Sequence, residues 1–204
     1  DCGASRMPRS YDLGERAATK ADTRARIVAA ALEIYRQRGY AGASNLAIAR
    51  AADVAPATVR NHFPEPEGLA RAVFDAMLGE LSVPTPAIFD GLAGLHDRIE
   101  RLARELAAFY ERSAPWWRLY EREPELITVW GGGVDAYYAD VEALIRAALG
   151  KLASDERSVA VVAAVIGPPT FFALKGRGLS FDAAVELTLE LVRPWLERRL
   201  GDLT

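Results

Sequence analysis

The chain has 204 residues, half of them apolar, which is enough to bury one or two compact cores. Its only cysteine, Cys2, leaves no internal disulfide framework. The longest apolar run, residues 159–174, contains Pro168-Pro169 and is too short for a membrane span, and no signal peptide is visible, so a cytoplasmic location is expected.

The net charge of −3 looks unfavourable for nucleic-acid binding, but the charges are unevenly distributed. Residues 1–62 hold 10 Lys and Arg against 6 Asp and Glu, whereas residues 63–204 hold 15 against 22. Such a difference is expected when one end of a chain meets a polyanion, although it also arises by chance on solvated surfaces. Residues 1–21 read as a disordered basic arm, which either reaches along DNA or carries its charge incidentally.

Ala, Leu, Glu and Arg dominate the composition and no β-type alternation is present, so the sequence predicts an all-α fold. The first helix is expected over 23–38, ended by Gly39. Two short helices follow, at 45–52 and 56–63, separated by a tight corner. Ser44 can cap the first and Pro56 can begin the second, which is the pattern of a helix-turn-helix.

The residues around this corner carry a family resemblance. They follow the order Ile48-Ala49-x-x-Ala52-x-Val54, then Thr58-Val59, then His62-Phe63, followed by Glu67 and Leu69. Upstream, the match continues through Ile27, Ala30, Ala31, Gly39 and Tyr40. Over about residues 23–78 the chain resembles the DNA-binding domain of the TetR family of transcriptional regulators.

The resemblance implies a DNA-binding domain over 22–81, in which helix 66–81 connects to a C-terminal domain over 82–204 that binds an effector and dimerises. The chain departs from the family pattern at four positions. Asp53 replaces a turn glycine, Ala55 a capping Ser or Thr, Arg60 a phosphate-binding tyrosine, and Pro66 a lysine. These departures concern individual contacts rather than the fold.

DNA recognition is the chemistry that can be assigned to residues. The expected DNA-binding residues lie on or near the two short helices and at the start of the first helix: Ser44, Ala57, Thr58, Arg60, Asn61, His62, Arg24 and Arg26. Arg60 can bind guanine or a phosphate, Asn61 suits adenine, and Thr58 suits a thymine methyl or a phosphate. Ser44, Arg24 and Arg26 suit phosphates, and Ala57 permits close approach. His62 either contacts a phosphate or packs beside Phe63.

The second half reads as amphipathic helices, giving about nine helices in all. They are expected at 87–113, directly after Pro115, at 126–150 with an interruption at Gly131–Gly133, at 155–175 and at 180–200. Three consecutive glycines suggest a break, a kink or a close approach of another element.

Two sets of apolar residues in this half have candidate roles. A ligand pocket is expected from the concentration of aromatic residues, by analogy with relatives: Phe109, Tyr110, Trp116, Trp117, Tyr120, Trp130, Tyr137, Tyr138, Phe171 and Phe172. The last two helices are apolar on more than one side, and the resemblance implies that they form a dimer interface through Val162, Ile166, Phe171, Val185, Leu189, Val192, Trp195 and Leu196. The simpler interpretation of both sets is the core of one chain.

The sequence offers no catalytic set, no metal-ligand cluster and no cofactor motif, so we expect neither an enzyme nor a cofactor. We expect a homodimeric repressor that a small apolar or aromatic effector releases from a palindromic DNA operator, without contact with a membrane. One alternative is a regulator of the same fold that activates transcription or needs no effector. Another is a helical small-molecule-binding protein with a vestigial helix-turn-helix.

Overall fold

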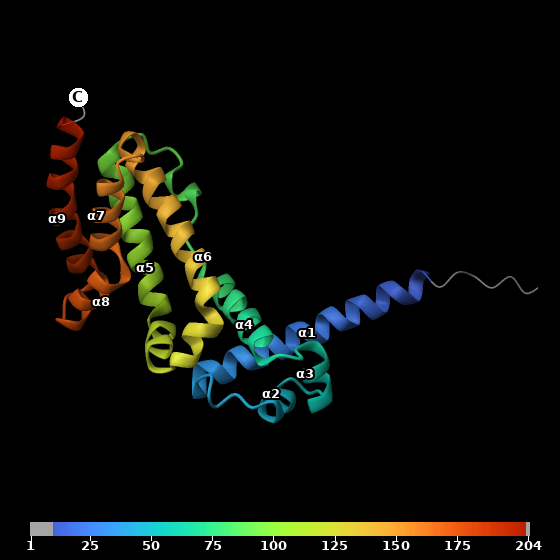
Figure 1. Ribbon diagram of the computed structural model, residues 1–204. Helices are drawn as coiled ribbons and strands as arrows, with labels where there is room; N and C mark the ends of the chain where they lie inside the picture. Colours follow the sequence, from blue (N-terminus) through green and yellow to red (C-terminus); the bar gives the residue numbers. More distant parts are fainter. Residues whose placement is uncertain (1–9, 203–204) are drawn as a thin grey trace, which may run out of the picture. The chain divides into compact units, whose positions relative to one another are not determined.

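The computed structural model describes residues 10–202, and every regular element in that range is helical (Figure 1). The α-helices are α1 Ser10–Arg38, α2 Asn45–Ala51, α3 Pro56–His62, α4 Pro66–Leu81, α5 Leu95–Arg122, α6 Pro124–Leu149, α7 Glu156–Ile166, α8 Pro168–Gly176 and α9 Phe181–Gly201. Short 3₁₀ helices η1 and η2 lie at Pro86–Phe89 and Gly150–Leu152. The predicted all-α fold is confirmed.

The chain divides into two compact units. The first runs to Met77 and also contains Arg122–Trp130, and the second comprises Leu78–Glu121 and Gly131–Thr204. Sequence analysis placed the boundary after residue 81, whereas the division by contacts falls slightly earlier, inside α4. The sequence did not predict that Arg122–Trp130 belongs to the first unit.

Helix α1 is longer than the predicted helix over 23–38. It begins at Ser10, so the expectation of a disordered arm is wrong for residues 10–21. The expectation for residues 1–9 lies outside the described part of the chain. The extension contains good helix formers, and the Thr19 and Thr23 hydroxyls each donate to the carbonyl four residues earlier, at 2.8 and 2.9 Å.

In the first unit, α1 packs against α2 and α2 against α3. The segment Arg122–Trp130 closes this unit. The Trp130 indole N–H donates to the carbonyl oxygen of Ala70 in α4 at 2.9 Å, and its ring lies 5.3 Å from that of Phe74. The Glu123 carboxylate accepts a hydrogen bond from the Ala41 amide at 3.0 Å. The segment therefore holds both α4 and the loop between α1 and α2.

The second unit contains α5 and α6, which both run through expected breaks. Pro115 was expected to begin a separate helix, but α5 continues through it. Buried Tyr110 and Ser113 before the proline, and buried Trp116 after it, fix both sides of the helix in the core. Packing of this kind offsets the roughly 3 kcal/mol that an internal proline costs.

The predicted interruption at the three glycines is also wrong, because α6 is continuous from Pro124 to Leu149. A Cβ atom added at Gly131 or Gly132 would meet nothing within 4 Å, so neither glycine is needed for a close approach. Gly131 is also the first residue of α6 that belongs to the second unit.

The predicted single helix over 155–175 is instead two helices. Gly167 is extended (φ −67°, ψ 164°), and Pro168 begins α8. Together, Glu156–Gly176 have the length and mean hydropathy (1.6) of a membrane span. One side of α7 is nevertheless buried in the core of this unit through Val159, Val162 and Ile166. A core helix of a globular unit has the same composition, and α7 and α8 also pack against α9 (Figure 1).

The open surroundings of the two glycines lead to a stability prediction. Gly131→Ala and Gly132→Ala should each stabilise the protein by about 1 kcal/mol, because alanine loses less backbone entropy in a helix. Gly167→Ala is the control, since its Cβ would lie 2.5 Å from the Ala163 carbonyl oxygen and should destabilise. Thermal and urea unfolding would measure all three, and a loss of stability at Gly131 or Gly132 would contradict the prediction.

Candidate nucleic-acid interface and ligand groove

The corner between α2 and α3 is built from local chemistry. The Ser44 hydroxyl caps α2 by accepting a hydrogen bond from the Ala47 amide at 3.2 Å, as expected. Asp53 occupies the left-handed region (φ 52°) at the position where the family has glycine. At the start of α3, Pro56 is in the first turn, and Ala55 makes no side-chain cap.

Arg26 takes a structural role at this corner. Its guanidinium donates to the carbonyl oxygens of Ala52 and Asp53, at 2.5 and 2.9 Å. These carbonyls lie at the C-terminal end of α2, where a cation also meets the negative end of the helix dipole. We expected Arg26 to bind a phosphate, but its donors are already directed at the turn.

Helix α3 is fixed by two buried side chains, and the side opposite to them is exposed. Val59 and Phe63 are buried, as their spacing predicted. Ala57, Arg60 and Asn61 are exposed on the opposite side. Arg60 and Asn61 thus combine a planar cation and an amide on an outward surface, which are the groups that read base edges in a major groove.

Thr58 and His62 have a different setting. Both are half-buried and line a hollow of about 450 Å³ beside α1, together with Thr19 and Lys20. The Arg24 guanidinium lies 4.8 Å from the centre of the Phe63 ring. Basic groups of α1 therefore lie next to the sides of α3, a placement suited to phosphates rather than bases.

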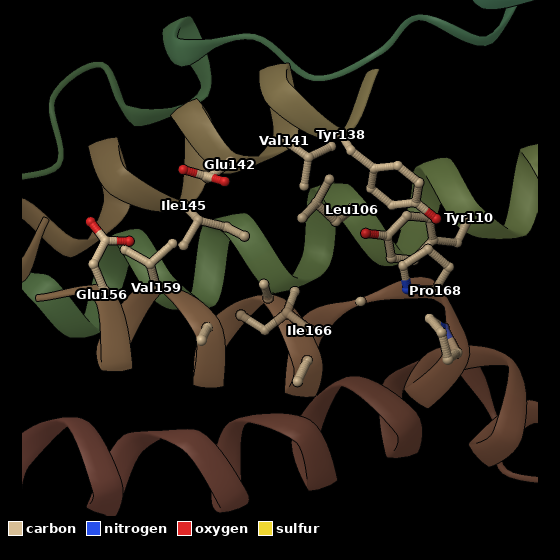
Figure 2. A pocket seen from close by; sticks show the side chains of 15 residues that line it. Leu106, Tyr110, Tyr138, Val141, Glu142, Ile145, Glu156, Val159, Ile166 and Pro168 are labelled. Atoms are coloured by element: carbon tan, nitrogen blue, oxygen red, sulfur yellow. The ribbon is translucent and has the colours of Figure 1, made fainter. Parts of the chain in front are cut away.

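The second unit contains a groove of about 560 Å³, within the usual size range of ligand sites (Figure 2). Residues of α5, α6, α7 and the start of α8 line it: Leu106, Tyr110, Tyr138, Val141, Glu142, Ile145, Glu156, Val159, Ala160, Ala163, Ala164, Ile166, Gly167, Pro168 and Pro169. Figure 2 shows Tyr110 and Tyr138 toward one end and Glu142 and Glu156 toward the other.

The polar groups of the groove differ in their partners. Arg146 bridges Glu142 and Glu156 at 2.7 and 2.8 Å, and its hydrogen bonds lower the pKa of Glu156. Burial raises the pKa of Tyr110 and of Tyr137, and the contact between the two phenols lowers the pKa of Tyr110 and raises that of Tyr137. Neither hydroxyl has another hydrogen-bond partner among the described residues.

Both units resemble parts of known proteins. Residues 27–73 match the model for bacterial regulatory proteins of the tetR family. No curated protein matches the chain significantly.

Solved structures extend the likeness to the TetR-family fold as a whole. The multidrug binding protein EbrR in complex with imidazole is 24% identical, with 94% of each chain covered and a TM-score of 0.56. A putative tetR-family regulator from Shewanella sp. PV-4 is 18% identical, covering 83% of this chain and 95% of its own (TM-score 0.58). FadR from Bacillus subtilis with stearoyl-CoA is 16% identical, covering 82% and 96% (TM-score 0.56). At these identities the shared property is the fold.

The TetR-like fold places the predicted pocket residues mainly in cores. Trp130 belongs to the first unit, and Phe109, Trp116, Tyr137 and Phe171 are buried in the second unit. Several of these rings contact one another, including a stacked pair of Phe109 and Tyr137 at 5.5 Å. Trp117, Tyr120 and Phe172 are half-buried next to this cluster.

Of the predicted set, Tyr110 and Tyr138 line the groove described above. Sequence analysis missed the opposite wall formed by α6 and α7, because those side chains have no distinguishing chemistry in the sequence. Glu142 and Glu156 are ordinary helix-surface residues until the two helices bring them together on Arg146.

The predicted dimer residues are also mostly interior. Val162, Ile166, Phe171, Val185, Leu189, Val192 and Leu196 are at most 5% exposed within one chain, which leaves no surface for a second copy to cover. Trp195 is half-buried. The exposed apolar residues of α9 lie close in sequence to these interior ones. The most exposed of them is Leu191, at 57%.

The placement of Arg26 leads to a stability prediction. Arg26→Met should destabilise the protein by about 1–2 kcal/mol, because the last carbonyls of α2 lose a charged donor at a partly exposed site. Lys20→Met removes the same charge from an exposed position of α1 and should change stability by less than about 0.5 kcal/mol. Urea unfolding compares the two variants. Equal effects on stability would contradict the structural role of Arg26 and would favour a phosphate contact instead.

Proposed function

We propose that this chain is a cytoplasmic, homodimeric repressor that leaves a palindromic operator when a small apolar or aromatic effector binds. The observation that carries the proposal is the exposed surface of α3, where Arg60 and Asn61 point away from a buried Val59. In a helix-turn-helix this is the surface that enters the major groove. Ala57 on the same surface would allow the helix to approach the bases closely.

The other predicted DNA contacts have positional rather than base-reading roles in the proposal. Ser44 lies at the N-terminal end of α2, where the hydroxyl proton and free backbone amides suit a phosphate. Thr58 and His62, beside Lys20 of α1, suit phosphates along one edge of the groove. Arg24 next to Phe63 would extend the same line of contacts.

An apolar strip on α9 supports dimerisation. The strip consists of Leu187, Leu191 and Trp195, which are exposed or half-buried. The opposite side of this helix already fills the core of the unit. A second copy that covers the strip would place two α3 helices on one duplex, and a two-fold operator requires two half-sites about one DNA turn apart.

The continuity of α6 supports a route from effector to DNA. One end of this helix carries Trp130, which holds α4, and the other carries Val141 and Ile145 of the groove. An effector that favours one arrangement of α6 would change the population of the DNA-binding state in proportion to its difference in affinity. Gly131 and Gly132 lie between the two ends, where a helix bends most easily.

Ligands of proteins with this fold fit such a role. EbrR has been solved with imidazole and with proflavin, and Bacillus subtilis FadR with stearoyl-CoA. These molecules differ in charge and size, so the likeness supports an effector site without naming the effector.

The deciding experiment is selection of bound sequences from random duplex DNA at a stated salt concentration. We expect a palindrome, and recovery of nothing above non-specific binding would overturn the proposal. With the selected site, Arg60→Ala and Asn61→Ala should each weaken binding by about tenfold to a hundredfold and relax the preference at one base pair per half-site. Arg101→Ala, which removes an equal charge from α5, is the control and should leave affinity within about twofold.

The apolar strip gives a second prediction. Leu191→Glu should convert the dimer to a monomer, because it buries an unpaired charge at the proposed interface. Leu46→Glu is the matched control, since Leu46 on α2 is similarly exposed (50%) but lies outside the strip. Light scattering after size exclusion separates the outcomes, and a dimeric Leu191→Glu protein would remove the strip from the proposed interface.

A further inference from the structure

The charged side chains of α9 fall into two groups. Most of them contact a polar partner elsewhere in the chain, either on α5 or at Asp155 just before α7: Asp182, Glu186, Arg193, Glu197 and Arg199. The other two, Glu190 and Arg198, are exposed and have no ion pair or side-chain hydrogen bond among the described residues. Helix α9 therefore leaves one acid and one base without a partner inside the chain.

These two residues lie on the side of α9 that carries the apolar strip. Glu190 follows Leu187 by three residues, and Arg198 follows Leu191 by seven. Both spacings place two residues on one side of a helix. Pro194, which is also exposed, belongs to the same side because it follows Leu187 by seven residues. A second copy that covers the strip would therefore meet both charges.

The two charges are placed symmetrically about Pro194. Glu190 precedes it by four residues, and Arg198 follows it by four. If two copies of α9 pack antiparallel with the two-fold axis at Pro194, each Glu190 faces the partner's Arg198. Four residues rise about 6 Å along a helix, so at a crossing angle of about 20° both side chains reach each other. A parallel pair of helices would instead place like charges opposite each other.

The sizes of the outward residues follow the same symmetry. Leu187 precedes Pro194 by seven residues, and Gly201 follows it by seven. The antiparallel arrangement thus places Leu187 opposite the partner's Gly201. A Cβ atom added at Gly201 would meet nothing within 4 Å, so this position is open to a side chain from outside. Leu191 would pack beside the partner's Pro194 and the apolar stem of the partner's Arg198.

We propose that α9 recognises its own copy through an antiparallel pairing centred on Pro194, in which Glu190 of each copy forms an ion pair with the partner's Arg198. The occupant of the strip is a second copy because the two free charges of one chain match those of an identical chain. Two-fold symmetry forms the ion pair twice, so each substitution changes two contacts. The inference rests on the proposed dimer and adds its register and the residues that make the chain select itself.

The first test reverses one charge at a time in the full chain. Glu190→Lys and Arg198→Glu should each raise the dissociation constant of the dimer by about tenfold or more at low salt, because like charges then face each other twice. About 0.5 M NaCl should remove part of this effect, since exposed charges are screened. Sedimentation equilibrium measures the dissociation constants.

Two residues of α5 provide matched controls for the charge reversals. Arg118 and Glu121 are exposed and have no ion pair among the described residues, so Arg118→Glu and Glu121→Lys should leave the dissociation constant within about twofold. A monomeric wild-type chain would overturn the proposed dimer itself. A wild-type dimer with equally tight dimers of both α9 variants would overturn only the pairing proposed here.

A mixture of the two α9 variants gives the sharper test. One variant chain has two bases at the paired positions and the other has two acids, so every acid faces a base in the mixed dimer. We expect the mixture to dimerise at concentrations at which each variant alone is a monomer. A chain with both Glu190→Lys and Arg198→Glu should dimerise with itself but not with the wild type. A mixture that stays monomeric, or a double variant that does not recover the dimer, would contradict the pairing.

Discussion

The arrangement of the first unit depends on one constraint, which is that α2 and α3 have only seven residues each. Helices of this length are not stable alone in water, so their orientation must come from tertiary contacts. Burial of Ile48 and Val59 supplies the apolar part, and Arg26 binds the end of α2 from α1. The outward surface of α3 can be polar because these contacts already hold the helix. The same contacts leave Arg60 and Asn61 exposed on that surface.

The first unit also depends on tertiary contacts outside the helix-turn-helix, and the segment Arg122–Trp130 supplies them. Its carboxylate at Glu123 binds the Ala41 amide, and a Cβ atom at Gly39 would collide with that carboxylate. Gly39 also has a positive φ of 78°, which is the main reason that glycine is favoured there, because the carboxylate could move aside. Helix α6 begins in the first unit, and its later residues belong to the second unit, where some of them line the groove. Any ligand effect on α6 therefore acts on a helix that already touches α4 and the loop after α1.

Local chemistry predicted local structure well. The Ser44 cap, the unusual turn at Asp53 and the bounds of α4 follow from residues within a few positions of each other. The predicted helix bounds are wrong where packing overrides local propensity. Helix α5 continues through Pro115, and α6 continues through its glycines. Contacts between residues far apart in sequence, such as Trp130 with Ala70, have no sequence pattern. The groove belongs to this class, since its two carboxylates are 14 positions apart and on different helices.

The two apolar sets in the second unit show what periodicity can and cannot decide. On α9, Val185 and Leu189 face the core, whereas Leu187 and Leu191 lie on the other side of the same helix. Both pairs have helical spacing, so hydrophobicity alone cannot say which pair a partner covers. The choice depends on which side α7 already occupies, and that is a property of the fold. The side of α9 that carries Val185 and Leu189 is already buried in the core. Leu187 and Leu191 bury little surface in the monomer, so they suit contact with a second copy better than the buried residues that were first assigned to the interface.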